Sequence, residues 1–375
     1  MTDLTLWHYS RPALAERYLT VLKSGITVST TIFAPRRMGK TTFLRKDLTP
    51  LAQKAGFIVA YADLWQTRHA PAAALIYGLE QALQPKTLGA KVMARLNTPV
   101  RGFKAGAEIA GAKVSGEVTL DTAQAEQSET ALRINSLLGA LCAKGPVLLL
   151  VDEAQELAKS KESELLATAL RTAITLHQDK LRVVFTGSSR TQLANVFSDA
   201  KAPLYSSGVA ITDFPLLGKD FVEFVRGKFK ASSGIRDLPA AQTWEAFEAL
   251  NRQPEPFLKC AFFMLLNPEA TFEDALAHVR EELTRQENHE GAWNALDLTQ
   301  KTLVKLLASN PTLKPFSGEV VDELRQKIGI DSLRKTHVQR AMAKLTDASI
   351  VTKEPSGLYE FENPSFRDWV RTLGD

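Results

Sequence analysis

A lysine and a threonine in one short loop are the first residues of this sequence whose types and spacing suit phosphate chemistry. The run APRRMGKTT (residues 34–42) is close to the phosphate-binding pattern of glycine, four residues, glycine, lysine and then serine or threonine. Backbone N–H groups of such a loop point at a β-phosphate, so Gly39 keeps the approach free of a side chain. Lys40 would reach the β- and γ-phosphates, and Thr41 would place its hydroxyl on Mg²⁺. The loop residues predicted to bind a nucleoside triphosphate are Pro35, Arg36, Arg37, Met38, Gly39, Lys40, Thr41 and Thr42.

The loop departs from the pattern at one position, because Ala34 stands where the first glycine belongs. That glycine serves the geometry of the turn, and alanine is the smallest substitute for it. A Gly-Lys-Thr-Thr run also fits an ordinary helix start that carries an incidental lysine. The context favours the phosphate loop, since a β-branched apolar run (residues 26–33) leads directly into it and a helical pattern starts at Lys40.

Two adjacent carboxylates, Asp152 and Glu153, follow the apolar run VLLLV (residues 147–151). In phosphate-loop enzymes a neighbouring strand ends in an aspartate that orders the Mg²⁺ shell, and a following glutamate can polarise the attacking water. Carboxylates at the end of a buried strand are costly without a cation partner. Helix capping or a place in a first helical turn is the structural alternative. We predict that Thr41 and Asp152 bind the metal and that Glu153 is the catalytic base.

A third apolar run ends in the polar stretch Thr186-Gly187-Ser188-Ser189-Arg190. A polar residue at that end of a strand could lie between the carboxylates and the γ-phosphate and sense hydrolysis. Ser188 or Ser189 could equally cap the helix that follows. The predicted catalytic residues are Lys40, Glu153 and Ser188.

The order of apolar and helical segments divides the chain into three parts. Over residues 1–215, strand patterns alternate with helical patterns, which predicts an α/β domain with a parallel sheet and helices on both faces. Small residues interleaved with apolar ones at 100–120 indicate a hairpin insertion. Residues 216–292 show only helical spacing and form a predicted all-α lid domain. Its aromatic residues are expected in its core; they are Phe221, Phe224, Trp244, Phe247, Phe262 and Phe263.

The last part, residues 293–375, has the order of a winged helix-turn-helix. Helical patterns at 298–310, 317–329 and 333–351 precede a two-stranded wing at 352–366, with its turn at Pro355-Ser356-Gly357. If the domain binds double-stranded DNA, the third helix would enter the major groove. Winged helices also serve protein contacts, so a protein partner is the alternative. The candidate nucleic-acid residues are Arg334, Lys335, Thr336, Gln339, Arg340 and Lys344.

Taken together, these motifs resemble one known family. The segments FAPRRMGKTTFL, LLLVDEAQELA, VVFTGSSRTQLANVF, APLYSSGVAITDFPLL and SGLYEFENPSFRDWVR are similar to the archaeal-ATPase-domain group of P-loop ATPases. That group is related to AAA+, STAND and origin-recognition ATPases and typically carries a C-terminal winged helix. The resemblance implies ATP as the nucleotide, Asp152 as the metal-ordering acid, Glu153 as the base and Ser188 near the sensor position.

The sequence departs from the family in two places. Members often read Pro-Leu-Tyr-Gly-Arg after the sensor strand, with an arginine for a neighbouring protomer's nucleotide, whereas here Tyr205 is followed by Ser-Ser-Gly. The lid motif appears as NRQPEPFLK (residues 251–259) without its flanking glycine. Arg252 is either a lid arginine over the γ-phosphate or a solvated arginine at a helix end. Alternative cationic contacts are Arg36, Arg37 and Arg190.

Composition limits the remaining classes. The chain is 45% hydrophobic and 23% charged with a net charge of +4, which is ordinary for a globular protein and permits nucleic-acid binding. No apolar run approaches the ~18 residues of a membrane span, and the N-terminus does not read as a signal peptide, so we expect a cytoplasmic protein without a membrane partner. Cys142 and Cys260 lie in apolar helical contexts and are expected to be buried thiols.

We therefore predict an ATP-binding, Mg²⁺-dependent ATPase that acts as a nucleotide-dependent switch, coupling ATP to DNA or a protein partner. It would be a monomer or a nucleotide-dependent oligomer. The alternative is an ATP-binding scaffold with little or no turnover, whose winged helix mediates protein contacts. A small-molecule kinase is disfavoured, because no acceptor-site motif is evident.

Overall fold

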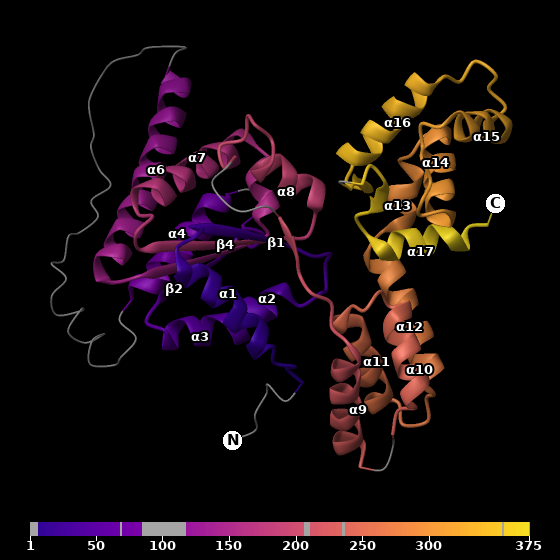
Figure 1. The fold of residues 1–375 in the computed structure, drawn as a ribbon, viewed down its shortest axis with the longest axis horizontal. Helices are drawn as coiled ribbons and strands as arrows, with labels where there is room; N and C mark the ends of the chain where they lie inside the picture. Colours follow the sequence, from indigo (N-terminus) through magenta and orange to yellow (C-terminus); the bar gives the residue numbers. More distant parts are fainter. Residues whose placement is uncertain are drawn as a thin grey trace.

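The computed structural model describes residues 7–67, 70–84, 118–205, 211–234, 237–354 and 356–374 (Figure 1). Most of the predicted hairpin at 100–120 lies outside these ranges, and so do the residues that directly follow Tyr205. Residues 118–120 belong to helix α6 (Val118–Lys144), so that end of the predicted hairpin is helical.

A parallel sheet forms the centre of the N-terminal α/β domain. Its strand order is β2-β3-β4-β1-β5, and every neighbouring pair is parallel. The edge strand β5 pairs with β1 over two residues, too few for a periodic pattern in the sequence. The strands are β1 (Ser29–Phe33), β2 (Ile58–Asp63), β3 (Val147–Asp152), β4 (Leu181–Gly187) and β5 (Thr212–Asp213).

Helices cover both faces of this sheet, with α6 and α7 on one side and α1 and α3 on the other (Figure 1). Successive side chains of β3 point to opposite faces, so Leu149 packs in one core and Leu148 and Leu150 pack in the other. This explains why the strand is a continuous apolar run. The predicted α/β class is confirmed. The covering helices are α1 (Pro12–Ser24), α3 (Thr49–Lys54), α4 (Pro71–Leu83), α6 and α7 (Lys161–Leu176).

Short helical segments follow strands β1, β3 and β4. The segments α2 (Lys40–Thr42), η1 (Phe43–Leu48) and α3 run on from the phosphate loop. The turn that follows contains Gly56, whose φ of 90° is in the left-handed region that favours glycine. Further segments are η2 (Ala154–Ala158) after β3 and α8 (Arg190–Phe197) after β4.

Residues 219–286 form a helical unit with its own aromatic core. Phe221, Phe229, Phe247 and Phe257 are buried there. Our expectation that Phe262 lies in the core was wrong, because its side chain is 60% exposed. The helices are α9 (Lys219–Ser233), α10 (Ala240–Ala249), α11 (Pro254–Leu266) and α12 (Phe272–Gln286).

The C-terminal unit, which we define as residues 289–374, has a separate core that includes Leu303, Leu324 and Leu345. After α13 (His289–Asn294) its elements follow the order expected for a winged helix. The strands pair antiparallel, as a wing requires. Helix α17 begins among residues we had assigned to the wing. The elements are α14 (Leu298–Ser309), α15 (Gly318–Ile328), α16 (Lys335–Asp347), β6 (Val351–Lys353), β7 (Tyr359–Phe361) and α17 (Pro364–Thr372).

Candidate active site

The phosphate loop connects β1 to α2 and takes its shape from two left-handed residues. Arg37 has a φ of 65° and Gly39 a φ of 84°. Ala34 is 3% exposed, and its φ is not positive. Since alanine adopts that conformation without steric cost, the departure from the sequence pattern does not strain the loop.

Lys40 lies under this loop with 5% of its surface exposed. Its ammonium group donates to the carbonyl oxygens of Ala34 at 2.5 Å and Pro35 at 3.0 Å. Burial lowers the pKa of Lys40, while the negative charges of Glu153 and Asp152 oppose that shift. The loop therefore holds a cation at the place where the sequence predicts the β- and γ-phosphates.

Asp152 ends β3 and is 1% exposed. Its carboxylate accepts from the hydroxyls of Thr41 (2.5 Å), Tyr61 (3.1 Å) and Thr186, and from the N–H of Glu153 (3.1 Å). The flanking strands β2 and β4 supply Tyr61 and Thr186. The two predicted metal residues, Thr41 and Asp152, are thus in direct contact.

Tyr61 did not stand out in the sequence, and Thr186 was named only as part of the polar stretch at the end of β4. A polar side chain near the end of each strand beside β3 was the only signal for them. Burial raises the pKa of Tyr61, and the charge of Asp152 adds to the effect, so its hydroxyl stays protonated and donates.

Glu153 has a left-handed backbone, with a φ of 56°, of the kind that proteins retain at functional sites. Its carboxylate accepts from the Ser188 hydroxyl at 2.8 Å and from the Gln155 amide. The same amide lies 3.1 Å from the Ser188 oxygen. Ser189 caps α8 by accepting from the N–H of Gln192 at 3.3 Å. The structure therefore separates the two serines, placing Ser188 on Glu153 and Ser189 on the helix.

Gln155 is a further residue that the sequence did not single out, and Gly187 was named only as part of the polar stretch. A Cβ at Gly187 would lie 2.6 Å from the Gln155 amide oxygen and 2.6 Å from Leu193 Cδ2, so both side chains would have to shift. Close packing at this point orients Gln155 toward Glu153.

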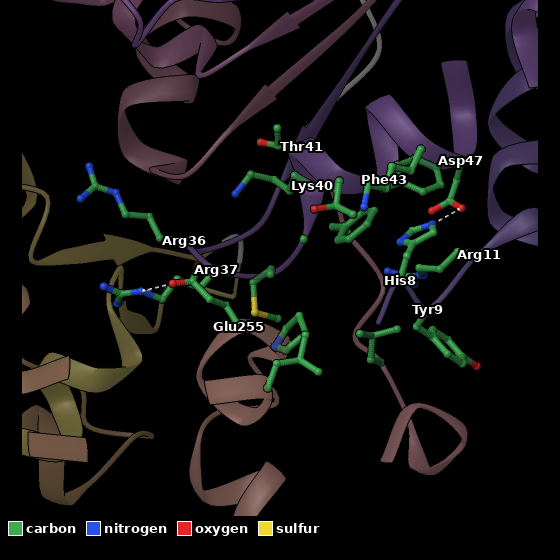
Figure 2. Close-up of a pocket in the computed structure, with 18 of the residues that line it drawn as sticks. His8, Tyr9, Arg11, Arg36, Arg37, Lys40, Thr41, Phe43, Asp47 and Glu255 are labelled. Atoms are coloured by element: carbon green, nitrogen blue, oxygen red, sulfur yellow. Dashed lines mark hydrogen bonds and ion pairs between the residues drawn. The ribbon is translucent and has the colours of Figure 1, made fainter. Parts of the chain in front are cut away.

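A cleft of about 830 Å³ extends from these residues to the helical unit, within the range of small-molecule sites. Figure 2 shows residues that line this cleft. Lys40 lies in the middle, with Arg36 on one side and His8, Tyr9 and Arg11 on the other. At the phosphate end it is lined by Arg36, Lys40, Thr41, Asp63, Trp65, Asp152 and Glu153. The far end is lined by Trp7, His8, Tyr9, Arg11, Phe43 and Phe214, and the helical side by Pro254, Leu258 and Phe262.

The far end is built by an N-terminal segment in which the sequence showed no site. His8 and Ser10 both contact the Asp47 carboxylate, at 3.0 and 2.8 Å. Arg11 donates to the carbonyl of Pro215 at 2.7 Å and lies over the ring of Phe214. These contacts hold aromatic and cationic side chains opposite the phosphate loop.

The arginines named as alternative cationic contacts lie in different surroundings. Arg37 pairs with Glu287 and Glu255, the second at 3.7 Å. Arg190 pairs with Asp213 and with Glu354 at 3.5 Å. The guanidinium of Arg36 lies 4.7 Å from the centre of the Trp65 ring.

Arg252 lies away from the phosphate loop. It donates to the carbonyl of Leu217 at 2.9 Å and lies over Trp244, and it does not line the cleft. Arg252 thus lies in the turn between α10 and α11, where it is half-buried and hydrogen-bonded to Leu217 and does not line the cleft.

Several residues of the C-terminal unit contact the other parts of the chain, among them Ser349 and Glu354, and the segment Glu362–Ser365 makes the contacts nearest the phosphate loop. The Glu362 carboxylate accepts from the N–H groups of Arg190 (2.9 Å) and Thr191 (2.8 Å), at the start of α8. Asn363 (2.7 Å) and Ser365 donate to Glu287, the partner of Arg37. One segment therefore reaches both the end of β4 and the phosphate loop.

The six candidate nucleic-acid residues all have exposed side chains on or next to α16. None of them lines the cleft. The buried side of α16 is apolar, with Val338, Met342 and Leu345 in the core of the unit. This surface is therefore separate from the phosphate site.

Cys142 and Cys260 are buried free thiols, as predicted, and burial raises the pKa of Cys260 to about 12. Across the part of the chain that the structure describes, no three His, Cys, Asp or Glu side chains gather as a metal site. One carboxylate with a neighbouring hydroxyl nevertheless fits Mg²⁺, which takes few protein ligands and fills its shell with phosphate oxygens and water. None of the helices within the described ranges is long and apolar enough to cross a membrane.

Comparisons with known proteins agree with this geometry. A family model described as an ATPase domain predominantly from Archaea matches residues 16–251. A Walker-type ATPase of Pyrococcus abyssi is 18% identical, with 98% of this chain and 99% of that one covered and a TM-score of 0.63. Cdc6p of Pyrobaculum aerophilum is 14% identical over 99% and 97% of the chains, with a TM-score of 0.47. No curated protein matches the chain. The predicted resemblance to this group is confirmed.

Proposed function

The chain belongs to the family of ATPase domains found predominantly in Archaea, and from that premise we propose that it hydrolyses ATP with Mg²⁺ and acts as a nucleotide-dependent switch. The observation that carries the proposal is the contact between Thr41 and the buried Asp152 beside Lys40. A cation, a hydroxyl and a carboxylate meet there at one end of a deep cleft.

Each residue at the phosphate end has a distinct task in this proposal. The N–H groups of the loop and Lys40 bind the β- and γ-phosphates, while Thr41 and Asp152 hold Mg²⁺. When bound, Mg²⁺ neutralises charge on the phosphate oxygens. Glu153 takes the proton of the attacking water, and Ser188 and Gln155 fix its carboxylate in position.

The base and ribose of ATP would occupy the far end of the cleft. The loop fixes the phosphates at one end, and the remaining length is lined by Tyr9, Arg11, Phe43 and other residues. Aromatic faces suit a purine, because stacking needs only a flat π-surface.

Arg37 supports the switch, because it belongs to the phosphate loop and yet pairs outside it. Through Glu287 it connects the loop to Asn363 and Ser365 of the C-terminal unit. A nucleotide that changes the loop would change this pair, and a ligand shifts a conformational equilibrium by its differential affinity for the two states.

Turnover of the wild type and of Glu153→Gln tests the enzyme. We expect Mg²⁺-dependent release of phosphate from the wild type and a loss of about 10²–10⁴-fold in the variant, with ATP binding retained. Equal, undetectable rates in two proteins that both bind ATP would favour the alternative, an ATP-binding scaffold.

For the output of the switch, we propose that α16 binds the major groove of DNA, in a winged helix. Its exposed basic face supports this. Replacing Lys335 and Arg340 by alanine should lower the slope of log affinity against log salt by about 2, since each phosphate contact contributes roughly 0.9. The matched control is Lys314→Ala with Lys327→Ala, which removes the same charge from exposed positions on neighbouring elements.

A protein contact is the competing output, and the acidic residues of the antiparallel strands β6 and β7 favour it. Glu354, Glu360 and Glu362 lie on or beside the two strands, and carboxylates repel phosphate. Two of them already contact the α/β domain, through Arg190 and Thr191. An unchanged salt slope in the Lys335 and Arg340 variant would support this output over DNA.

A further inference from the structure

Of the arginines near the phosphate end, Arg36 is held differently from the others. Arg37 and Arg190 pair with carboxylates, whereas no carboxylate within the described ranges pairs with Arg36. The guanidinium of Arg36 instead lies over the ring of Trp65, at 4.7 Å from its centre. Its charge is therefore not committed to a protein anion.

Arg36 also points to the end of the cleft where the reaction would occur. Figure 2 shows its side chain leaving the loop on the side toward which the Lys40 ammonium points, away from His8 and Arg11. Burial lowers the pKa of Lys40, and the positive charge of Arg36 adds to that lowering, as expected for two nearby cations. A γ-phosphate on Lys40 would lie between them.

Trp65 connects Arg36 to β3, the strand that ends in Asp152. Trp65 follows β2. The backbone N–H of the residue before it, Leu64, donates to the carbonyl of Asp152 at 3.1 Å. Trp65, Arg36 and Glu153 line the same end of the cleft. The ring therefore holds an exposed cation at the cleft that Glu153 also lines.

We propose that Arg36 is a catalytic residue that acts on ATP bound to its own chain. Its guanidinium leaves the face of Trp65, contacts the γ-phosphate and stabilises negative charge in the transition state. An exposed cation–π contact is weak compared with the charge-assisted hydrogen bonds that arginine makes to a phosphoryl group in transfer, so the transition state can displace it. This inference rests on the proposed hydrolysis.

The chemical step balances without any further reactant. A water oxygen forms a bond to the γ-phosphorus, and the bond from that phosphorus to the β–γ bridging oxygen breaks. The electron pair stays on ADP, and the water proton passes to Glu153 and then to solvent. Arg36 supplies no proton; it neutralises charge on the γ oxygens as the bond breaks.

The location of Arg36 also bears on the arginine that is missing after Tyr205. The chain reads Ser-Ser-Gly there, where related sequences often carry an arginine for a neighbouring protomer. A cation within the loop makes a second protomer unnecessary for the reaction. Turnover per chain should then be independent of protein concentration.

The test compares Arg36→Ala and Arg36→Lys with Lys159→Ala. Lys159 lies over the same Trp65 ring, at 5.5 Å, and pairs with Glu156 at 2.6 Å, but it does not line the cleft, so it is the control for contacts of that ring. We expect Arg36→Ala to lower kcat by about 10²–10³-fold with little change in the affinity for ATP. Lysine should restore only part of the rate, because it lacks the planar fork of arginine. The control should keep the wild-type rate.

A binding measurement gives a readout besides turnover. ADP with aluminium fluoride mimics the phosphoryl group in transfer, so its affinity measures contacts made in the transition state. Arg36→Ala should weaken this complex in the same proportion as kcat while leaving ADP alone unchanged.

Several outcomes would overturn the inference. An active wild type with an Arg36→Ala rate within about threefold would do so, as would equal weakening of ADP and of ADP with aluminium fluoride, which denotes ground-state binding only. A rate per chain that rises with protein concentration would point to a second protomer. A wild type that binds ATP without turnover contradicts the proposed function instead, and the aluminium fluoride comparison still decides the role of Arg36.

Discussion

Two carboxylates, the buried Asp152 and the partly buried Glu287, each accept several hydrogen bonds, and their partners differ in charge. Asp152 accepts from three hydroxyls and one N–H, all of them neutral. Glu287 accepts from Asn363 and Ser365 but also pairs with the guanidinium of Arg37. Hydrogen bonds satisfy both groups, yet only Glu287 has its charge balanced by a contacting cation.

This difference separates a site for chemistry from a structural contact. Neutral donors make the burial of Asp152 tolerable, but its negative charge stays available for a divalent cation. The charge of Glu287 is already used, so it stabilises the arrangement of the loop and the C-terminal unit. The type of donor around a buried carboxylate is thus more informative than its burial alone.

The strongest test of the comparison is Asp152→Asn. We expect ATP turnover to fall by about 10²–10³-fold and Mg²⁺ to lose its effect on ATP affinity, because the charge that attracts the ion is gone. The thermal midpoint should stay the same or rise, since a buried charge without a contacting cation has been removed. Calorimetric titration with and without Mg²⁺ and a melting curve measure the two effects. Mg²⁺-dependent tightening in the variant would contradict the assignment.

Next in size is a pH effect at His289, which lies 3.4 Å from Glu287 and 3.0 Å from the Ser365 hydroxyl. Burial and the nearby charge of Arg37 lower the pKa of His289 to about 4, from 6.5. Between these values the unfolded chain binds more protons than the folded one, so stability rises with pH across this window. It should fall by about 3 kcal/mol as the pH drops from 6.5 to 4.

The control for this effect is His289→Gln, which keeps a hydrogen-bonding group without the titration. Denaturant unfolding measured across the window should show a shallower pH dependence in the variant, because only the contribution of His289 is removed. Parallel curves for the two proteins would place the titration elsewhere.

A third test removes the charge of Glu287. Glu287→Gln leaves the guanidinium of Arg37 without its closest carboxylate, and we expect a loss of about 2 kcal/mol, typical of a hydrogen bond to a charged group in a partly buried place. The side chain of Glu287 is 13% exposed. Glu281→Gln, on the helix α12 that Glu287 directly follows, is the matched control, because its pair with Arg285 is exposed and should contribute less than about 0.5 kcal/mol. Equal losses in urea unfolding would argue against a structural role for Glu287.

The smallest effect is expected from Ala34→Gly, which restores the sequence pattern of the loop. Ala34 already has an ordinary backbone conformation, so the change should alter stability by less than about 1 kcal/mol and leave ATP affinity nearly unchanged. Gly39→Ala is the contrast, since a left-handed backbone costs alanine about 1–2 kcal/mol. A large gain in affinity from Ala34→Gly would mean that the first glycine does more than shape the turn.

The sequence singled out residues that meet at Asp152 and none of the contacts of Glu287. Lys40, Thr41 and Asp152 could be found because phosphate chemistry requires those residue types at the ends of neighbouring strands. Arg37 and Glu287 meet through the packing of separate units, and no local pattern records which distant residue an ion pair will use. The N-terminal segment with Tyr9 and Arg11 was not predicted as part of the site for the same reason, because only the fold brings it opposite the phosphate loop.

The position of Glu362–Ser365 in the chain has a consequence for the order of folding. During synthesis the α/β domain and the helical unit emerge first, so the N–H groups at the start of α8 and the carboxylate of Glu287 must wait for Glu362, Asn363 and Ser365, which are synthesised later. Hydrophobic cores can form earlier, because each unit has its own. A nascent chain would therefore reach its final arrangement around the phosphate loop only after residue 365 has left the ribosome.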